Sequence, residues 1–84
     1  MSFDDIKKYS YLIAWSQEDL AYIATCVEFP SLIAHGETKE KAMAEIESVV
    51  RDSIEWLEEE NEYIPLPLWQ RESKKERVAN YAFA

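Results

Sequence analysis

The chain has 84 residues and a formal net charge of −8, and residues 1–67 hold five Lys and Arg against fifteen Asp and Glu. A chain of this length forms one domain, and its acidic main body would repel a phosphate backbone, which excludes direct nucleic-acid binding by that body. The single cysteine excludes an intramolecular disulfide framework, no apolar run approaches the roughly 20 residues that span a bilayer, and residues 1–5 lack a secretion signal, so we expect a cytoplasmic protein.

Two strands joined by a hairpin are predicted after a polar lead-in. Aromatic and branched side chains alternate with other residues along Tyr9–Trp15, and a similar alternation runs along Leu20–Cys26. The polar residues 16–19 between them suit a hairpin turn. We therefore expect the two strands to pair in an antiparallel manner.

A third and shorter strand is expected at residues 32–35. Phe29-Pro30-Ser31 precedes it and is expected to interrupt the sheet, because proline lacks a backbone N–H and restricts the residue before it. Gly36, the only glycine of the chain, follows the strand. Because glycine tolerates φ > 0, we expect Gly36 to adopt such a conformation in a sharp turn out of the strand.

A long amphipathic helix is predicted from Lys39 to about Glu60, with Thr38 as its N-cap residue. Apolar residues recur in it at spacings of three and four, which is typical of a helix with one buried face. These residues are Ala42, Met43, Ile46, Val49, Val50, Ile54, Trp56 and Leu57. Asn61 is expected to end the helix in the left-handed conformation, and two prolines then hold residues 63–67 in an extended path.

These elements predict an α+β fold in which a three-stranded antiparallel meander is covered by one long helix, in the order β-β-β-α. Residues 1–67 form this domain. Residues 68–84 form a C-terminal tail or arm, which we expect to cross to a neighbouring subunit. The end of this tail fits a fourth short strand or a docking arm, and its charged middle could equally be helical.

Four short motifs follow one another along residues 9–67. They are the strand and hairpin at residues 9–22, Val27-Glu28-Phe29-Pro30-Ser31-Leu32, Ala34-His35-Gly36-Glu37-Thr38 with Glu40 and Ala42, and Ile64-Pro65-Leu66-Pro67. In this order they resemble the HicB family of antitoxins, including its short stand-alone members. The resemblance implies a partial RNase H-like fold and a dimer or tetramer that binds and blocks a small basic ribonuclease toxin, usually HicA.

The resemblance does not extend to DNA binding. Many full antitoxins of this family carry a C-terminal DNA-binding module that represses their own operon. Only 17 residues follow Pro67, which is too short for a helix-turn-helix, and no second helix follows residues 78–83 to complete a ribbon-helix-helix. We therefore expect no DNA-binding role for this chain alone.

Catalysis is not expected. A two-metal nuclease needs several carboxylates at the strand ends, whereas the first strand has none and the other acids are expected on turns or on the solvent face of the helix. His35 is expected to be structural and bonded to a nearby backbone group, with a switch near neutral pH as the alternative. Cys26 is expected to be a buried small residue, and one cysteine with one histidine makes no zinc site. No catalytic residue, cofactor or metal is predicted.

Two surfaces are expected to bind other proteins. An acidic cluster would face the Lys and Arg of a toxin; it comprises Glu55, Glu58, Glu59, Glu60 and Glu62. Aromatic residues would bury the uncovered sheet face in a homo-oligomer; they are Trp15, Tyr22, Trp69, Tyr81 and Phe83. The leading interpretation is therefore a non-catalytic antitoxin. A structural or regulatory oligomer without a toxin partner is the alternative, and a metal-dependent nuclease is the weakest interpretation.

Overall fold

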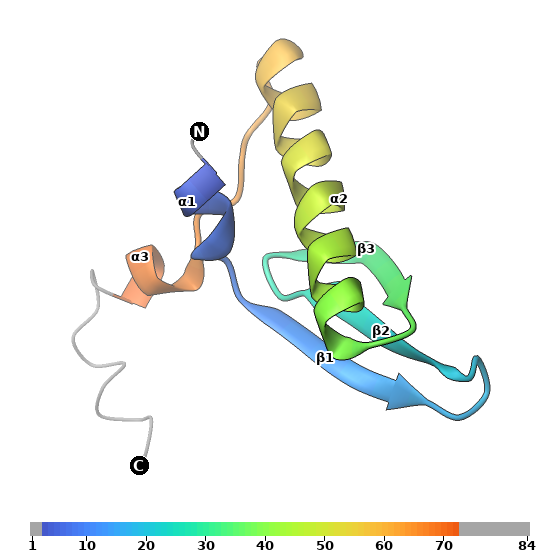
Figure 1. Cartoon of the computed structure of the whole chain (residues 1–84). Coiled ribbons are helices and arrows are strands. Elements are labelled where there is room, and N and C mark those ends of the chain that lie inside the picture. Colours follow the sequence, from blue (N-terminus) through green and yellow to red (C-terminus); the bar gives the residue numbers. More distant parts are fainter. Residues whose placement is uncertain (1–2, 73–84) are drawn as a thin grey trace.

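One long helix lies across one face of a three-stranded antiparallel sheet whose strand order is β1-β2-β3 (Figure 1). The computed structural model describes residues 3–72. The elements in chain order are α1 (Phe3–Lys7), β1 (Tyr11–Ser16), β2 (Ala21–Cys26), β3 (Phe29–Gly36), α2 (Lys39–Glu59) and α3 (Leu68–Glu72). The predicted α+β arrangement of three strands followed by a covering helix is confirmed.

The first hairpin pairs Tyr11 with Cys26 at one end and Ser16 with Ala21 at the other. The strand begins two residues later than predicted, because Tyr9 is not part of the ladder. The ring of Tyr9 is buried and packs edge-on against Phe29, with ring centroids 5.5 Å apart. Tyr9 therefore belongs to the core beside the sheet, although its alternation with Tyr11 suggested a strand position.

The third strand begins at Phe29, so the predicted interruption by Phe29-Pro30-Ser31 is wrong. Cys26 pairs with Phe29 across a tight turn, and the register between β2 and β3 is irregular at Thr25 and Cys26. β3 is an edge strand, where the missing N–H of Pro30 can be tolerated because one side of the strand has no neighbour. The prediction from proline therefore failed because it depends on where the strand lies in the sheet.

Gly36 has no positive φ, which contradicts the expected left-handed turn. Its role is steric. A Cβ atom built on Gly36 would lie 2.7 Å from Ala42 Cα and 2.8 Å from the carbonyl carbon of Lys41, and it would also meet the backbone nitrogen of Ala42. Glycine is required here because the first turn of α2 presses its backbone against the end of β3.

Both ends of α2 are capped as predicted. The Thr38 hydroxyl accepts the backbone N–H of Lys41 at 3.1 Å. Beyond the C-terminal end, Asn61 has φ 57°, and the Glu62 N–H donates to the Leu57 carbonyl at 2.8 Å. This is a Schellman arrangement, which satisfies carbonyl groups left open at a helix end.

The core lies between α2 and the sheet. From α2 it takes Ala42, Ile46, Val50 and Ile54, which are buried as the helical spacing predicted. Trp56, assigned to the same stripe, is instead 57% exposed. From the sheet the core takes Ala24, Cys26 and Ala34, and these small side chains let the helix approach closely.

The segment before β1 is part of this core, so describing it as a polar lead-in was wrong. Ile6 on α1 is buried in the same cluster. The Tyr11 hydroxyl donates to the Ile6 carbonyl at 2.7 Å, and Lys7 Nζ lies 3.7 Å from Glu47 Oε1 on α2. α1 therefore closes one side of the space between α2 and the sheet.

After α2 the chain returns toward α1 and forms the short helix α3 beside it (Figure 1). The Tyr9 hydroxyl donates to the Pro65 carbonyl at 2.7 Å and holds the returning segment in place. The predicted fourth strand, with Tyr81 and Phe83, lies outside the described residues. No helix within residues 3–72 combines the length and the hydropathy that crossing a membrane requires.

Candidate functional site

Five acidic side chains gather at the C-terminal end of α2 and just beyond it. They are Glu55, Glu58, Glu59, Glu60 and Glu62, and all are exposed. The last turn of α2, which the structure describes in full, holds no basic residue. This end of the helix lies away from the sheet (Figure 1), so its negative potential meets solvent and would attract a basic protein. We call these five residues the acidic cluster.

Two large aromatic side chains are exposed in the same region, and sequence analysis did not assign them to it. Trp56 lies on α2, and Tyr63, which is 75% exposed, follows the end of the helix. Positions three and four apart are neighbours on a helix surface, so Trp56 lies beside Glu59 and Glu60. Trp and Tyr are enriched at protein interfaces, where one side chain can supply a large apolar contact.

A groove of about 390 Å³ lies between α2 and β3, and Trp56 forms part of its wall. Phe29, Leu32 and Leu57 also line the groove, together with the carboxylate of Asp52. The groove thus continues the exposed surface of Trp56 toward the edge strand. Its lining of apolar side chains beside carboxylates suits a protein segment that carries both apolar and basic residues.

Glu28 is a buried carboxylate that sequence analysis placed only in a motif. It is 5% exposed and lies in the tight turn between β2 and β3. Its Oε1 accepts the Ser10 N–H at 2.9 Å, and its Oε2 accepts the Ser10 hydroxyl at 3.1 Å and the Leu68 N–H at 2.8 Å. Glu28 therefore joins the start of β1, the β2–β3 turn and the start of α3.

The hydrogen bonds to Glu28 decide its charge. Burial raises its pKa, but the N–H groups of Ser10 and Leu68 favour the ionised form and bring the pKa below its usual value. The thiol of Cys26 donates to Glu28 Oε1 at 3.4 Å. Burial raises the pKa of Cys26 to about 11, so the thiol is protonated at neutral pH and suits the structural role predicted for it.

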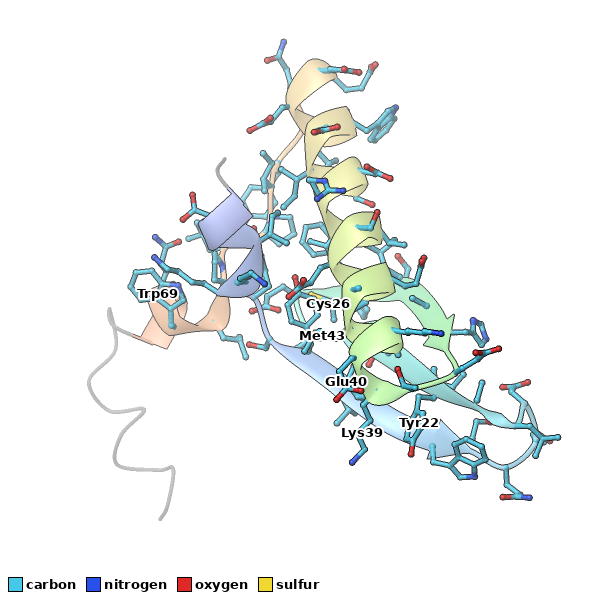
Figure 2. The ribbon with its side chains drawn as sticks, in the orientation of Figure 1. Tyr22, Cys26, Lys39, Glu40, Met43 and Trp69 are labelled. Atoms are coloured by element: carbon cyan, nitrogen blue, oxygen red, sulfur yellow. The ribbon has the colours of Figure 1, made fainter. Side chains whose placement is uncertain are left out.

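The aromatic residues predicted to form an oligomer interface do not share one surface. Trp15 packs edge-on against Tyr22, with ring centroids 5.1 Å apart, and Lys39 Nζ lies 6.0 Å from the Tyr22 ring centroid. This group lies at the start of α2, and Trp69 lies apart from it on α3 (Figure 2). Tyr81 and Phe83 lie outside the described residues. The sheet face opposite α2 carries Leu12, Ile23 and Ile33 instead of aromatic residues.

The remaining polar side chains of the described residues form no metal-binding group. His35, expected to be structural and bonded to a nearby backbone group, is exposed on β3. No group of three or more His, Cys, Asp or Glu side chains within the described part of the chain is arranged to hold a metal ion. The acidic cluster with Trp56, Tyr63 and the adjoining groove is therefore the candidate site that the geometry supports.

No family model, curated protein or solved structure matches this chain.

Proposed function

We propose that the protein is a HicB-like antitoxin, a non-catalytic binding protein that neutralises a small basic ribonuclease toxin in the cytoplasm by covering its surface. The observation that carries this proposal is the joint exposure of the acidic cluster and Trp56 at one end of α2. It agrees with what the sequence resemblance implies, namely that the partner is a basic protein.

The two kinds of side chain would play different parts. The carboxylates would attract Lys and Arg of the toxin over a distance and raise the association rate. Trp56 would then pack against the partner and exclude water, which mainly slows dissociation. The groove between α2 and β3 would accept an apolar segment next to the basic one. Inhibition would follow from occlusion, because the proposed site supplies no group that reacts with RNA.

The decisive experiment is co-expression with the product of the adjacent gene. We expect that gene to encode a small basic protein that copurifies with this chain and cleaves RNA when alone. RNA cleavage by the purified partner should fall as this chain is added, and Trp56→Ala should need a higher concentration for the same inhibition. The variant Trp15→Ala, at another exposed tryptophan, is the matched control and should inhibit like the wild type.

The alternative is a structural or regulatory oligomer without a toxin partner. It predicts no copurifying basic protein, and no effect of this chain on a neighbouring ribonuclease. A metal-dependent nuclease is a third class, and it predicts RNA cleavage by this chain alone in the presence of Mg²⁺. Absence of binding to the neighbouring gene product would remove the antitoxin proposal in favour of the first alternative.

A further inference from the structure

A cavity of about 210 Å³ lies between α1, the segment that returns from α2, and α3. We call it the α1–α3 pocket. Its walls are mostly apolar and consist of Tyr9, Ile64, Pro65, Leu66, Pro67 and Trp69. Three polar residues, Asp5, Lys8 and Gln70, also line it, and it shares no lining residue with the groove between α2 and β3. Apolar walls with a few polar groups are typical of sites that bind small molecules.

Hydrogen bonds between distant parts of the chain hold the walls of the α1–α3 pocket in place. The Tyr9 hydroxyl donates to the Pro65 carbonyl at 2.7 Å, which fixes the returning segment. Glu28 accepts the Leu68 N–H at 2.8 Å and thereby fixes the start of α3. A pocket whose walls are ordered before binding loses little conformational entropy when a ligand enters.

The size and the aromatic walls of the pocket favour a ligand with one aromatic ring. An apolar cavity of about 150 Å³ can hold a benzene molecule, so a volume of about 210 Å³ leaves room for one ring and a short extension. Tyr9 and Trp69 both line the pocket, and Trp69 on α3 is 48% exposed (Figure 2). Aromatic rings gain from edge-to-face or offset contacts with one another. A ligand ring beside Trp69 would also remove part of its apolar surface from water.

The charged groups of the pocket favour a ligand that is a zwitterion. Among the described residues, Asp5 and Lys8 are the only charged ones that line it, so the lining carries one group of each sign. Lys8 Nζ lies 5.9 Å from the Trp69 ring centroid, next to the surface on which a ligand ring would pack. The ammonium group would bind a ligand carboxylate, and the carboxylate of Asp5, which can accept several hydrogen bonds, would bind an amino group. A ligand that carried only a carboxylate would be repelled by a chain with a net charge of −8.

We propose that the α1–α3 pocket binds the zwitterion of a free aromatic amino acid. The ring would lie beside Trp69, the carboxylate at Lys8 and the amino group at Asp5. The pocket contains no residue of the acidic cluster, so the proposal does not depend on the antitoxin function.

Calorimetric titration of the full chain with L-phenylalanine tests this proposal. We expect a dissociation constant on the order of 0.1 mM, which is in the range for a ligand of this size. 3-Phenylpropionate lacks the amino group and phenethylamine lacks the carboxylate, so each should bind about tenfold more weakly. L-Alanine lacks the ring and should show no measurable binding.

Substitutions of the two charged residues assign the two ends of the ligand. Lys8→Gln should weaken L-phenylalanine binding about tenfold and leave phenethylamine binding unchanged, because phenethylamine has no carboxylate. Asp5→Asn should likewise weaken L-phenylalanine binding and leave 3-phenylpropionate binding unchanged. The control Lys41→Gln, at an exposed lysine on α2, should bind L-phenylalanine like the wild type. Lys8→Gln should inhibit the toxin like the wild type if the antitoxin proposal holds, so the two proposals fail separately.

Amide chemical shifts of the isotope-labelled protein locate the ligand without any substitution. L-Phenylalanine should shift the amide signals of Tyr9, Leu66 and Gln70, and it should leave those of Ser53 and Trp56 beside the other groove unchanged. Three results would overturn the proposal: no binding of L-phenylalanine at millimolar concentration, equal affinity for L-phenylalanine and its two singly charged analogues, or shifts confined to the groove between α2 and β3.

Discussion

The carboxylate of Glu28 accepts the backbone N–H of Leu68 at 2.8 Å, and the two residues are 40 positions apart in the chain. The same carboxylate accepts the N–H of Ser10 from the other direction. A single buried side chain thus links the start of β1, the turn between β2 and β3, and the start of the short helix α3. Removing the Glu28 carboxylate should therefore weaken the packing of all three segments.

Replacing Glu28 should destabilise the protein. Glu28→Ala leaves the N–H groups of Ser10 and Leu68 without their acceptor in a buried place, which should lower the free energy of unfolding by about 2–4 kcal/mol. Glu28→Gln keeps one acceptor and the shape, so its effect should be smaller. Urea unfolding monitored by tryptophan fluorescence measures both. Glu18→Ala, in the exposed first hairpin turn, is the control and should stay within about 0.5 kcal/mol of the wild type.

Glu28 should also make stability fall in acid. Its pKa in the folded protein lies below the ordinary value of 4.5, so the ionised form is favoured by folding. The stabilisation is then complete above that ordinary value and is lost as the pH falls through the lower folded-state pKa. Unfolding free energies measured from neutral pH downward should therefore fall less steeply in Glu28→Gln than in the wild type. Parallel curves for the two proteins would contradict this assignment.

Gly36→Ala should weaken the contact between β3 and α2. The added methyl group would meet the backbone of Lys41 and Ala42, which cannot move without shifting the first turn of the helix. We expect a loss of about 1–3 kcal/mol in thermal or urea unfolding. Ser31→Ala changes an exposed position of the same strand and should have almost no effect. Equal stability of Gly36→Ala and the wild type would show that α2 does not approach β3 this closely.

Cys26 should be unreactive in the native state. It is buried, and its pKa of about 11 leaves almost no thiolate at neutral pH, which is the reactive form. A thiol reagent such as iodoacetamide should therefore label the protein only as fast as it unfolds, and urea should accelerate the labelling strongly. Rapid stoichiometric labelling without urea would mean that the thiol is accessible.

Charge reversal in the acidic cluster should slow toxin association. The variant Glu55→Lys/Glu59→Lys/Glu62→Lys removes the attraction for a basic surface and should lower the association rate, with a smaller dependence on salt. Stopped-flow or surface-based kinetics at two ionic strengths would measure this. Reversal of Glu18, Glu37 and Glu45, which are exposed elsewhere, gives the same net charge. Identical kinetics for the two triple variants would mean that the acidic cluster is not the contact site.

The three strands and α2 could be predicted in their order because each depends on neighbours in the sequence. The strands show alternation at every second residue, and α2 shows apolar residues at spacings of three and four. Thr38 and Asn61 mark its ends through contacts within the adjacent turn. The exposure of the acidic cluster was also predictable, because its residues lie on the last turns of α2 and directly after them.

The predictions that were wrong or missing concern residues whose role depends on distant parts of the chain. Ile6 has too few apolar neighbours in sequence to mark a core segment, yet it is buried against α2. Trp56 fits the helical spacing, but its side chain lies on the wall of the groove between α2 and β3 and is left 57% exposed. An acidic residue between Val27 and Phe29 was the one available signal for a buried carboxylate at Glu28, and nothing local distinguished it from an ordinary turn residue.

The amino-acid sequence by itself determined the order of the strands and α2, the ends of α2 and the negative charge of its exposed face. Hydrophobic periodicity, helix capping and side-chain charge each depend on only a few neighbouring residues. Only the tertiary structure decided that Glu28 would be buried and ionised, that α2 would approach β3 closely enough to require Gly36, and that Trp56 would stay exposed beside the groove. These depend on which segments meet in space. That choice comes from burying one common core, which no single stretch of the chain specifies.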